Sequence, residues 1–156
     1  MHTEEAIRTR RAVKAYDPSF QLSREEKDEL LQLALLAPSA FNLQHVRFVE
    51  VSDPALRAQI REVGWNQAQM TDASMLVVIC AQVDSWEKNV RRVWEGAPSE
   101  VQDYMAGAID AYYRGKPQVQ RDEAMRSCGL MAQTLMLAAR AKGLDSCPMD
   151  GFAFDA

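Results

Sequence analysis

The sequence predicts an α+β domain in which helices outnumber strands. Two short segments, residues 46–51 and 74–83, are rich in Val together with Phe or Ile, which is typical of β-strands. Helical patterns precede, separate and follow them, and residues 122–143 form the clearest one. The order helices, strand, helix, strand and helices, within 156 residues, predicts a single domain spanning residues 1–156.

Capping residues define the first two helices. Thr3 is expected to cap a helix over residues 4–10, whose acidic first turn suits the helix dipole. Ser23 and Glu26 have the spacing of a capping box and predict a helix over residues 24–36, before a proline that stops it.

The remaining elements follow from turn residues and apolar spacing. A helix is expected from Pro54 to the residue before Gly64. The apolar run 74–83 predicts a buried central strand. Residues 85–95 and 99–114 are compatible with helices, each followed by a glycine.

The helix predicted over residues 122–143 carries few polar residues. Small and apolar side chains occur nearly all round it, and Gly143 is expected to end it. Such a helix must be buried on most sides, in a core or in a subunit interface. The sequence after it has loop composition.

Composition excludes several classes of protein. The net charge of −4 argues against a general nucleic-acid-binding surface. Three widely spaced cysteines support neither a zinc site nor a disulfide framework. No apolar run approaches the roughly 18–20 residues that cross a bilayer, and the N-terminus lacks a signal-peptide core. We therefore expect a cytoplasmic protein without nucleic-acid or membrane partners.

The usual catalytic motifs do not occur. The sequence has no GxGxxG, Walker A, HExxH or GxSxG pattern. Its two histidines have no metal-binding spacing, so we predict neither a metal site nor a catalytic side chain.

Two segments carry unusual polar chemistry. Residues 8–14 hold three arginines and a lysine, which suit phosphate binding but also occur on ordinary solvated surfaces. Residues 37–48, APSAFNLQHVRF, place Pro, Ser, Asn and Gln between two apolar segments. Each segment alone is compatible with a simple surface loop.

Taken together, four segments in order resemble the FMN-dependent nitroreductases. Residues 10–16 (RRAVKAY) are similar to the opening basic motif of that family, and residues 38–46 (PSAFNLQHV) to its Pro-Ser-x-x-Asn-x-Gln segment. Residues 65–81 resemble the Asn-x-x-Gln/Lys stretch before its central strand, and residues 143–152 its Gly-x-x-x-x-Pro-x-x-Gly-Phe loop.

The resemblance implies a fold and an assembly. It predicts a nitroreductase-like fold with a central, mostly antiparallel sheet flanked by helices, and a long buried helix at a homodimer interface. The flavin sites would lie at that interface. The segment with Pro38, Ser39, Ala40 and Asn42 would reach the FMN held mainly by the partner subunit.

The resemblance also implies cofactor-binding residues. Arg10 would bind the FMN phosphate, with Arg11 and the Ala12 position adjacent, and Lys14 would lie by flavin N1 and O2. Amides that read the pyrimidine edge are expected at Asn66 and Gln69. The loop that approaches flavin N5 and O4 is expected to contain Pro148, Met149, Asp150 and Gly151. Backbone N–H groups around Asp150 and Gly151 would point at these flavin atoms, since a glycine lets the backbone come close.

The implied activity is reduction of nitro compounds, quinones or related acceptors by NADH or NADPH in a ping-pong cycle. Hydride would pass to flavin N5, the nicotinamide would leave, and a small-molecule acceptor would take its place. Two alternatives stay open: a flavin-binding protein with little turnover, and another flavin reaction such as reductive dehalogenation or enoate reduction.

The sequence departs from the family pattern in three places. Ala12 stands where a hydroxyl residue is usual, which removes a contact worth about 1–3 kcal/mol. His45-Val46 replaces the common Pro-Trp. The family continues beyond the position of Ala156 with a further strand and an arm, so we expect a truncated chain, with weaker FMN affinity and dimer stability if it ends there.

Overall fold

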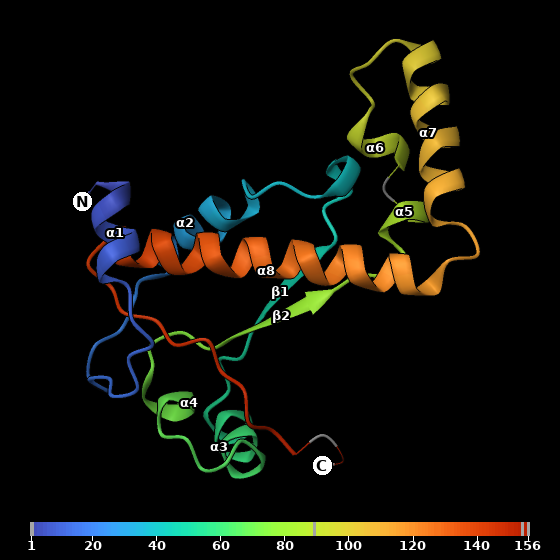
Figure 1. Cartoon of the computed structure of the whole chain (residues 1–156). Coiled ribbons are helices and arrows are strands. Elements are labelled where there is room, and N and C mark those ends of the chain that lie inside the picture. The colour runs from blue at the N-terminus through green and yellow to red at the C-terminus, as the bar shows by residue number, and fades with distance from the viewer. Residues whose placement is uncertain (1, 89, 154, 156) are drawn as a thin grey trace. The chain divides into compact units, whose positions relative to one another are not determined.

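The computed structural model describes residues 2–88, 90–153 and 155, and its elements follow the predicted order (Figure 1). They are α1 (Thr3–Thr9), α2 (Arg24–Leu35), the 3-10 turn η1 (Ala40–Asn42), β1 (Val46–Glu50), α3 (Pro54–Val63), α4 (Gln69–Asp72), β2 (Val77–Ala81), α5 (Ser85–Lys88), α6 (Val90–Val93), α7 (Ser99–Tyr113) and α8 (Pro117–Ala141).

Strands β1 and β2 form a two-stranded sheet. The Val51 N–H donates to the Leu76 carbonyl at 2.9 Å, and the Gln82 N–H donates to the His45 carbonyl at 2.6 Å. The pairing runs forward along one strand and backward along the other, so the strands are antiparallel. The α+β class is confirmed.

The predicted burial of the second strand is wrong for the single chain. No side chain of β2 is fully buried, and Val78 is 45% exposed. In a sheet of two strands each strand is an edge, so β2 has a hydrogen-bonded neighbour on one side only.

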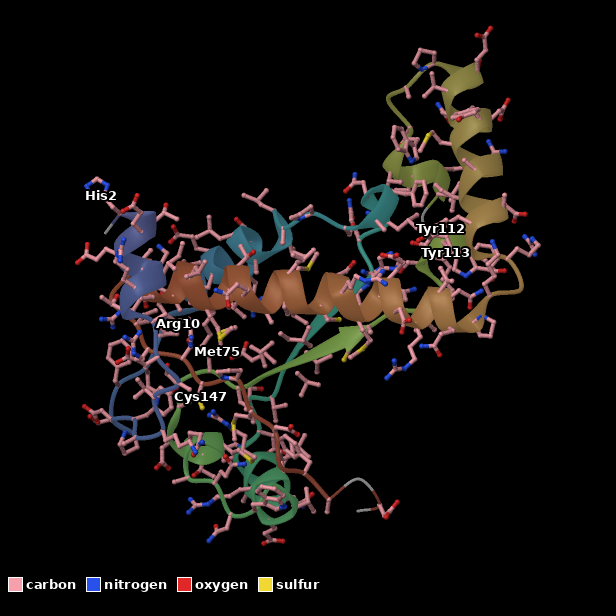
Figure 2. All side chains as sticks on the ribbon, viewed as in Figure 1. His2, Arg10, Met75, Tyr112, Tyr113 and Cys147 are labelled. Carbon is pink, nitrogen blue, oxygen red and sulfur yellow. The ribbon has the colours of Figure 1, made fainter. Side chains whose placement is uncertain are left out.

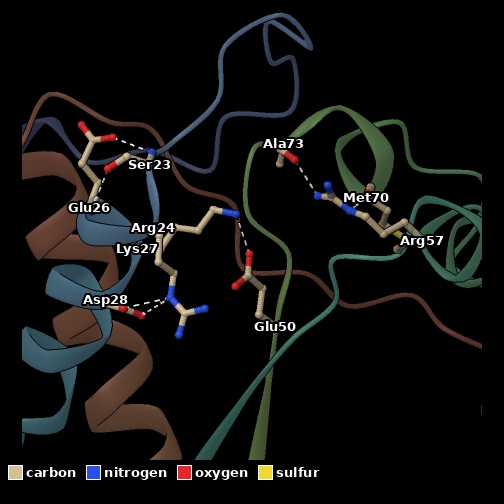
Figure 3. A network of polar contacts seen from close by, with 9 residues as sticks. All are labelled: Ser23, Arg24, Glu26, Lys27, Asp28, Glu50, Arg57, Met70 and Ala73. Atoms are coloured by element: carbon tan, nitrogen blue, oxygen red, sulfur yellow. Dashed lines mark hydrogen bonds and ion pairs between the residues drawn. The ribbon is translucent and has the colours of Figure 1, made fainter.

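The capping box of α2 forms as predicted. The Ser23 N–H donates to Glu26 Oε2 at 2.7 Å, and the Glu26 N–H donates to Ser23 Oγ at 3.1 Å (Figure 3). The cap predicted for α1 is wrong. Thr3 is the first helical residue, and His2 precedes it without a side-chain cap.

Contacts group the chain into two compact units that interleave along the sequence. Unit 1 comprises residues 1–34, 48–78 and 132–156, and unit 2 comprises residues 35–47 and 79–131.

Side-chain contacts tie the elements of unit 1 together. The Lys27 ammonium on α2 and the Glu50 carboxylate on β1 form an ion pair of 2.6 Å, largely shielded from solvent (Figure 3). The Arg57 guanidinium on α3 donates to the carbonyls of Met70 and Ala73 at 2.8 and 2.5 Å. These bonds hold the segment after α3, where the third of the four sequence motifs lies.

The core of unit 2 is aromatic. Leu43, Trp86, Ile109 and Tyr113 pack together, and all are at most 7% exposed. The rings of Trp86 and Tyr113 stack with their centroids 6.2 Å apart. The helical segment expected over residues 85–95 forms two short helices, α5 and α6, with Asn89 outside the described residues.

Helix α8 begins at Pro117, five residues before its predicted start, and buries one stripe in the single chain. Ala124, Ser127 and Met131 are buried at helical spacing, whereas Met125 and Leu130 are 50% and 47% exposed. Burial of this exposed apolar face in a subunit interface remains a prediction. In the part of the chain that the structure describes, no helix is long and apolar enough to cross a membrane.

Candidate cofactor site

Two of the sequence motifs, the opening one and the third, meet the fourth in unit 1 at residues 146–151, which we name the C-terminal loop. The opening motif joins it through a parallel bridge between Ala12 and Ser146, in which the Val13 N–H donates to the Ser146 carbonyl at 3.2 Å. The third motif joins it through Gln67, whose Nε2 donates to the Asp150 carbonyl at 3.0 Å. Segments from three parts of the sequence thus form one site.

The opening motif supplies positive charge without a matching acid. Arg10 is half-buried and Lys14 is exposed, and neither forms an ion pair with any residue in the described ranges. Arg11 folds back, and its Nη1 donates to the carbonyls of Arg8 and Arg10, each at 2.8 Å. Arg10 and Cys147, both labelled in Figure 2, belong to unit 1. The site therefore has cationic groups available for an anion.

Gly151 is held at a point where no side chain fits. Its φ is +87°, and a Cβ there would lie 2.6 Å from Cε3 of Trp65. Its N–H, predicted to face a flavin, donates to Asp150 Oδ1 at 2.8 Å. The close approach expected of this glycine is present, but it is made to a tryptophan ring of the chain itself.

Asn66 and its neighbour adopt a backbone conformation that is rare for residues with a side chain. Trp65 and Asn66 have φ values of 55° and 52°. Asn66 Oδ1 accepts a hydrogen bond from Arg61 Nε at 2.8 Å. Asn66 is exposed, and no described residue accepts from its Nδ2, which leaves an amide donor available.

Gln69 lies behind the site. It is only 5% exposed, and its Nε2 donates to Gln67 Oε1 at 3.2 Å and contacts Cys147 Sγ at 4.0 Å. It therefore supports the contact between Gln67 and the C-terminal loop. Gln67 and Trp65 were not predicted from the sequence. Gln67 stands between two amides that were singled out, whereas nothing in the pattern distinguished Trp65.

Tyr16, the last residue of the opening motif, lies beside the C-terminal loop. Burial, together with the charges of Cys147 and Asp145, raises the pKa of Tyr16 to about 12. The phenol therefore stays neutral, and can donate a hydrogen bond, throughout the physiological pH range.

The motif around residues 38–44 lies in unit 2, where it forms a tight loop. Ser39 Oγ accepts from the Gln44 N–H at 2.9 Å, and the Ser39 carbonyl accepts from the Asn42 N–H at 2.9 Å. The hydroxyl of Ser39 therefore stabilises the loop itself. The Asn42 side chain is exposed.

The five described non-glycine residues with positive φ all belong to two of the motifs. They are Phe41, Asn42, Gln44, Trp65 and Asn66. Such conformations cost free energy and persist where surrounding contacts enforce them, commonly at functional sites. Backbone strain thus marks the same two segments as the sequence motifs.

Four further residues predicted to bind the cofactor lie in the 38–44 loop and in the C-terminal loop. Pro38 and Pro148 are exposed, Ala40 and Met149 are half-buried, and the Pro148 carbonyl accepts from Cys147 Sγ at 3.5 Å.

Aromatic side chains of α7 adjoin the 38–44 loop. The rings of Phe41 and Tyr112 meet edge to face with centroids 5.5 Å apart, and Tyr112 Oη donates to Glu123 Oε1 at 3.0 Å. Tyr112 is 41% exposed, whereas Tyr113 is fully buried. Tyr113 is therefore a packing residue, whereas Tyr112 has exposed surface that a ligand could contact.

A family model described as "Nitroreductase family" matches residues 7–156. The chain is similar to the protein DrgA of Synechocystis, with 53% identity over 97% of this chain and 72% of the relative. It is also similar to YodC of Bacillus subtilis, which carries the name NAD(P)H nitroreductase, with 35% identity over 97% of this chain and 77% of the relative.

The fold has a close counterpart among solved structures. A nitroreductase from Exiguobacterium sibiricum, solved in complex with FMN, superposes with a TM-score of 0.90 at 28% sequence identity. The match covers 99% of this chain and 77% of that protein.

Proposed function

Because this chain belongs to the nitroreductase family, we propose that it is an FMN-dependent oxidoreductase that uses NADH or NADPH to reduce nitro compounds, quinones or related acceptors. The observation that carries the proposal is the meeting of the opening and third motifs with the C-terminal loop, next to Arg10 and Lys14, which have no acidic partner among the described residues. The FMN in the Exiguobacterium structure and the name of YodC support the choice of cofactor and co-substrate.

The residues present fit FMN by charge and shape. Arg10 and Arg11 would hold the dianionic phosphate, since a guanidinium can bind two phosphate oxygens at once. Lys14 would place positive charge by flavin N1 and O2. The Asn66 Nδ2 donor would meet a carbonyl on the pyrimidine edge, with Gln69 behind it. The loop around Gly151 would turn its backbone toward the flavin, although in this structure Gly151 packs against Trp65 and its N–H bonds to Asp150.

When bound, FMN would supply the redox chemistry, accepting hydride from the nicotinamide and passing electrons to the acceptor in a ping-pong cycle. The chain would supply position and electrostatics. The Lys14 charge would favour negative charge on the ring, and the strained segments would hold their backbone groups in place. No side-chain acid, base or nucleophile is needed for this role.

We further propose that the protein works as a homodimer. The exposed apolar side chains Met125 and Leu130 on α8 would be covered by a second copy. The loop with Pro38, Ser39, Ala40 and Asn42 would then contribute to the flavin site of that copy.

The proposal is tested with purified protein and added FMN. We expect a yellow protein whose flavin absorbance bleaches when NADH or NADPH is added without oxygen and returns when a quinone is supplied. A yellow protein that neither dinucleotide bleaches would favour the flavin-binding alternative. A protein that does not retain FMN would contradict both.

A further inference from the structure

Two guanidinium groups converge on one residue of the 38–44 loop. Arg92 Nη2 on α6 donates to Gln44 Oε1 at 2.9 Å. Arg47 Nη1 on β1 donates to the Gln44 carbonyl at 2.9 Å and to the Val46 carbonyl at 2.8 Å. All of these residues belong to unit 2, so the arrangement is internal to that unit.

Gln44 is itself firmly held. Its φ is +53°, and its N–H donates to Ser39 Oγ at 2.9 Å. The backbone carbonyl and the side-chain Oε1 of Gln44 therefore each accept from an arginine, while its backbone N–H donates within the loop. Gln44 thus binds both guanidinium groups, that of Arg47 through its backbone carbonyl and that of Arg92 through its side chain.

No carboxylate in the described ranges pairs with these two arginines. Four other cations of unit 2 are neutralised, in the pairs Lys88–Asp84, Arg114–Asp110, Arg121–Asp122 and Arg126–Glu123. Arg91 and Lys116 also lack a carboxylate partner among the described residues, so what distinguishes Arg47 and Arg92 is their shared hydrogen bonding to Gln44. Arg47 and Arg92 are exposed and bond only to neutral oxygens. Two positive charges are therefore positioned but not compensated.

We propose that Arg47 and Arg92, both hydrogen-bonded to Gln44, form an anion site that binds the 2′-phosphate of NADPH and so selects NADPH over NADH. This inference rests on the proposed function, in which the 38–44 loop faces the flavin. A 2′-phosphate carries close to two negative charges, which two guanidinium groups match, and its oxygens suit their paired N–H donors. NADH lacks this group, so it would gain nothing from the site.

The test compares the two dinucleotides on the FMN-loaded protein. Wild type, Arg92→Gln and Arg47→Gln are mixed anaerobically with NADPH or NADH, and kcat/KM for flavin reduction is obtained from stopped-flow traces at fixed salt. Arg91→Gln is the matched control, since Arg91 is the exposed neighbour of Arg92 on α6 and makes no contact with Gln44. Binding of adenosine 2′,5′-bisphosphate and 5′-AMP is measured in parallel by competition or calorimetry.

Wild type should prefer NADPH, and each of the two substitutions should lower the NADPH-to-NADH ratio of kcat/KM by about tenfold, the size expected for one charge-assisted contact. Arg91→Gln should leave the ratio within about twofold, because unpaired exposed charges contribute little. The bisphosphate should lose affinity in both variants while 5′-AMP does not.

An unchanged ratio in active variants, or an equal loss in Arg91→Gln, would overturn the anion site. The variants could instead lose turnover with 4-nitrobenzoate but not with nitrobenzene, while the NADPH-to-NADH ratio of kcat/KM stays constant. That result would overturn the assignment to NADPH and show that the two arginines bind an anionic acceptor. A wild-type protein that neither dinucleotide reduces would contradict the proposed function instead, and the bisphosphate titration would then still decide whether the two arginines bind phosphate.

Discussion

The backbone of Gly151 lies directly against the indole of Trp65, and a Cβ at residue 151 would fall 2.6 Å from Cε3 of that ring. Two residues further along the chain, the Ala153 N–H donates to the Val63 carbonyl at 3.0 Å. The C-terminal loop is therefore held against the end of α3 by close packing as well as by hydrogen bonds. The geometry of this loop depends on the absence of one side chain.

Gly151→Ala should destabilise the protein by about 1–3 kcal/mol, because it combines a positive φ with a clash against Trp65. Urea unfolding measures the change. Gly107→Ala on α7 is the control, since a Cβ there meets nothing within 4 Å and alanine should gain about 0.5–1 kcal/mol in a helix. Equal stability of Gly151→Ala and wild type would show that the loop can move away from Trp65.

Local signals in the sequence predicted most of the helices and strands. Ser23 and Glu26 located α2, and Pro54 and Gly64 located α3, because caps and stops act within a few residues. The short turns η1 and α4 were missed. The α4 turn is held by Arg57 of the preceding helix α3, whose bonds span 13 and 16 residues of sequence and are not encoded by any capping or turn pattern.

The site could be predicted as a set of residues but not as a network. Family resemblance brought together the motifs that the Ala12–Ser146 bridge and the Gln67–Asp150 contact join. It did not indicate that the Gly151 N–H would bond to the Asp150 carboxylate. Hydrogen-bond choices of this kind depend on competing partners that become neighbours only after folding.

Arg10→Ala should weaken FMN binding by about 10- to 100-fold, the loss expected for a charge-assisted contact with phosphate. Lys14→Met should change affinity much less and should lower the flavin reduction potential, because a positive charge near N1 favours the reduced ring. About 30 mV corresponds to 1.4 kcal/mol for two electrons. Fluorescence titration and potentiometry separate the two effects. Equal losses of affinity without a shift in potential would contradict the assigned roles.

Met125→Glu should weaken the proposed dimer, because it places a charge on the exposed apolar face of α8, where Met125 is 50% exposed. Analytical ultracentrifugation across a dilution series should show a dissociation constant at least about tenfold higher, equivalent to 1.4 kcal/mol. Gln118→Glu, at an exposed position of the same helix, should leave it unchanged. A dimer unaffected by Met125→Glu would place the interface elsewhere.

His45 should make stability depend on pH. Its side chain is fully buried, and neither ring nitrogen bonds to a described residue. Burial lowers the pKa of His45, while the Gln82 backbone and the Glu123 charge oppose the shift more weakly. The unfolded chain therefore takes up the proton first. The contribution of neutral His45 is complete above about pH 6.5 and is lost as the pH falls toward the lowered pKa, by up to about 1.4 kcal/mol per pH unit.

Chemical unfolding between pH 5 and pH 7.5 tests this expectation. His45→Phe should remove the slope, and His45→Gln serves the same purpose if the phenylalanine variant does not fold. His2→Gln is the control, because His2 is exposed and is the other histidine of the chain. A slope that survives in a folded His45 variant would assign the pH dependence to other groups, and a slope lost in His2→Gln would exclude His45 as its source.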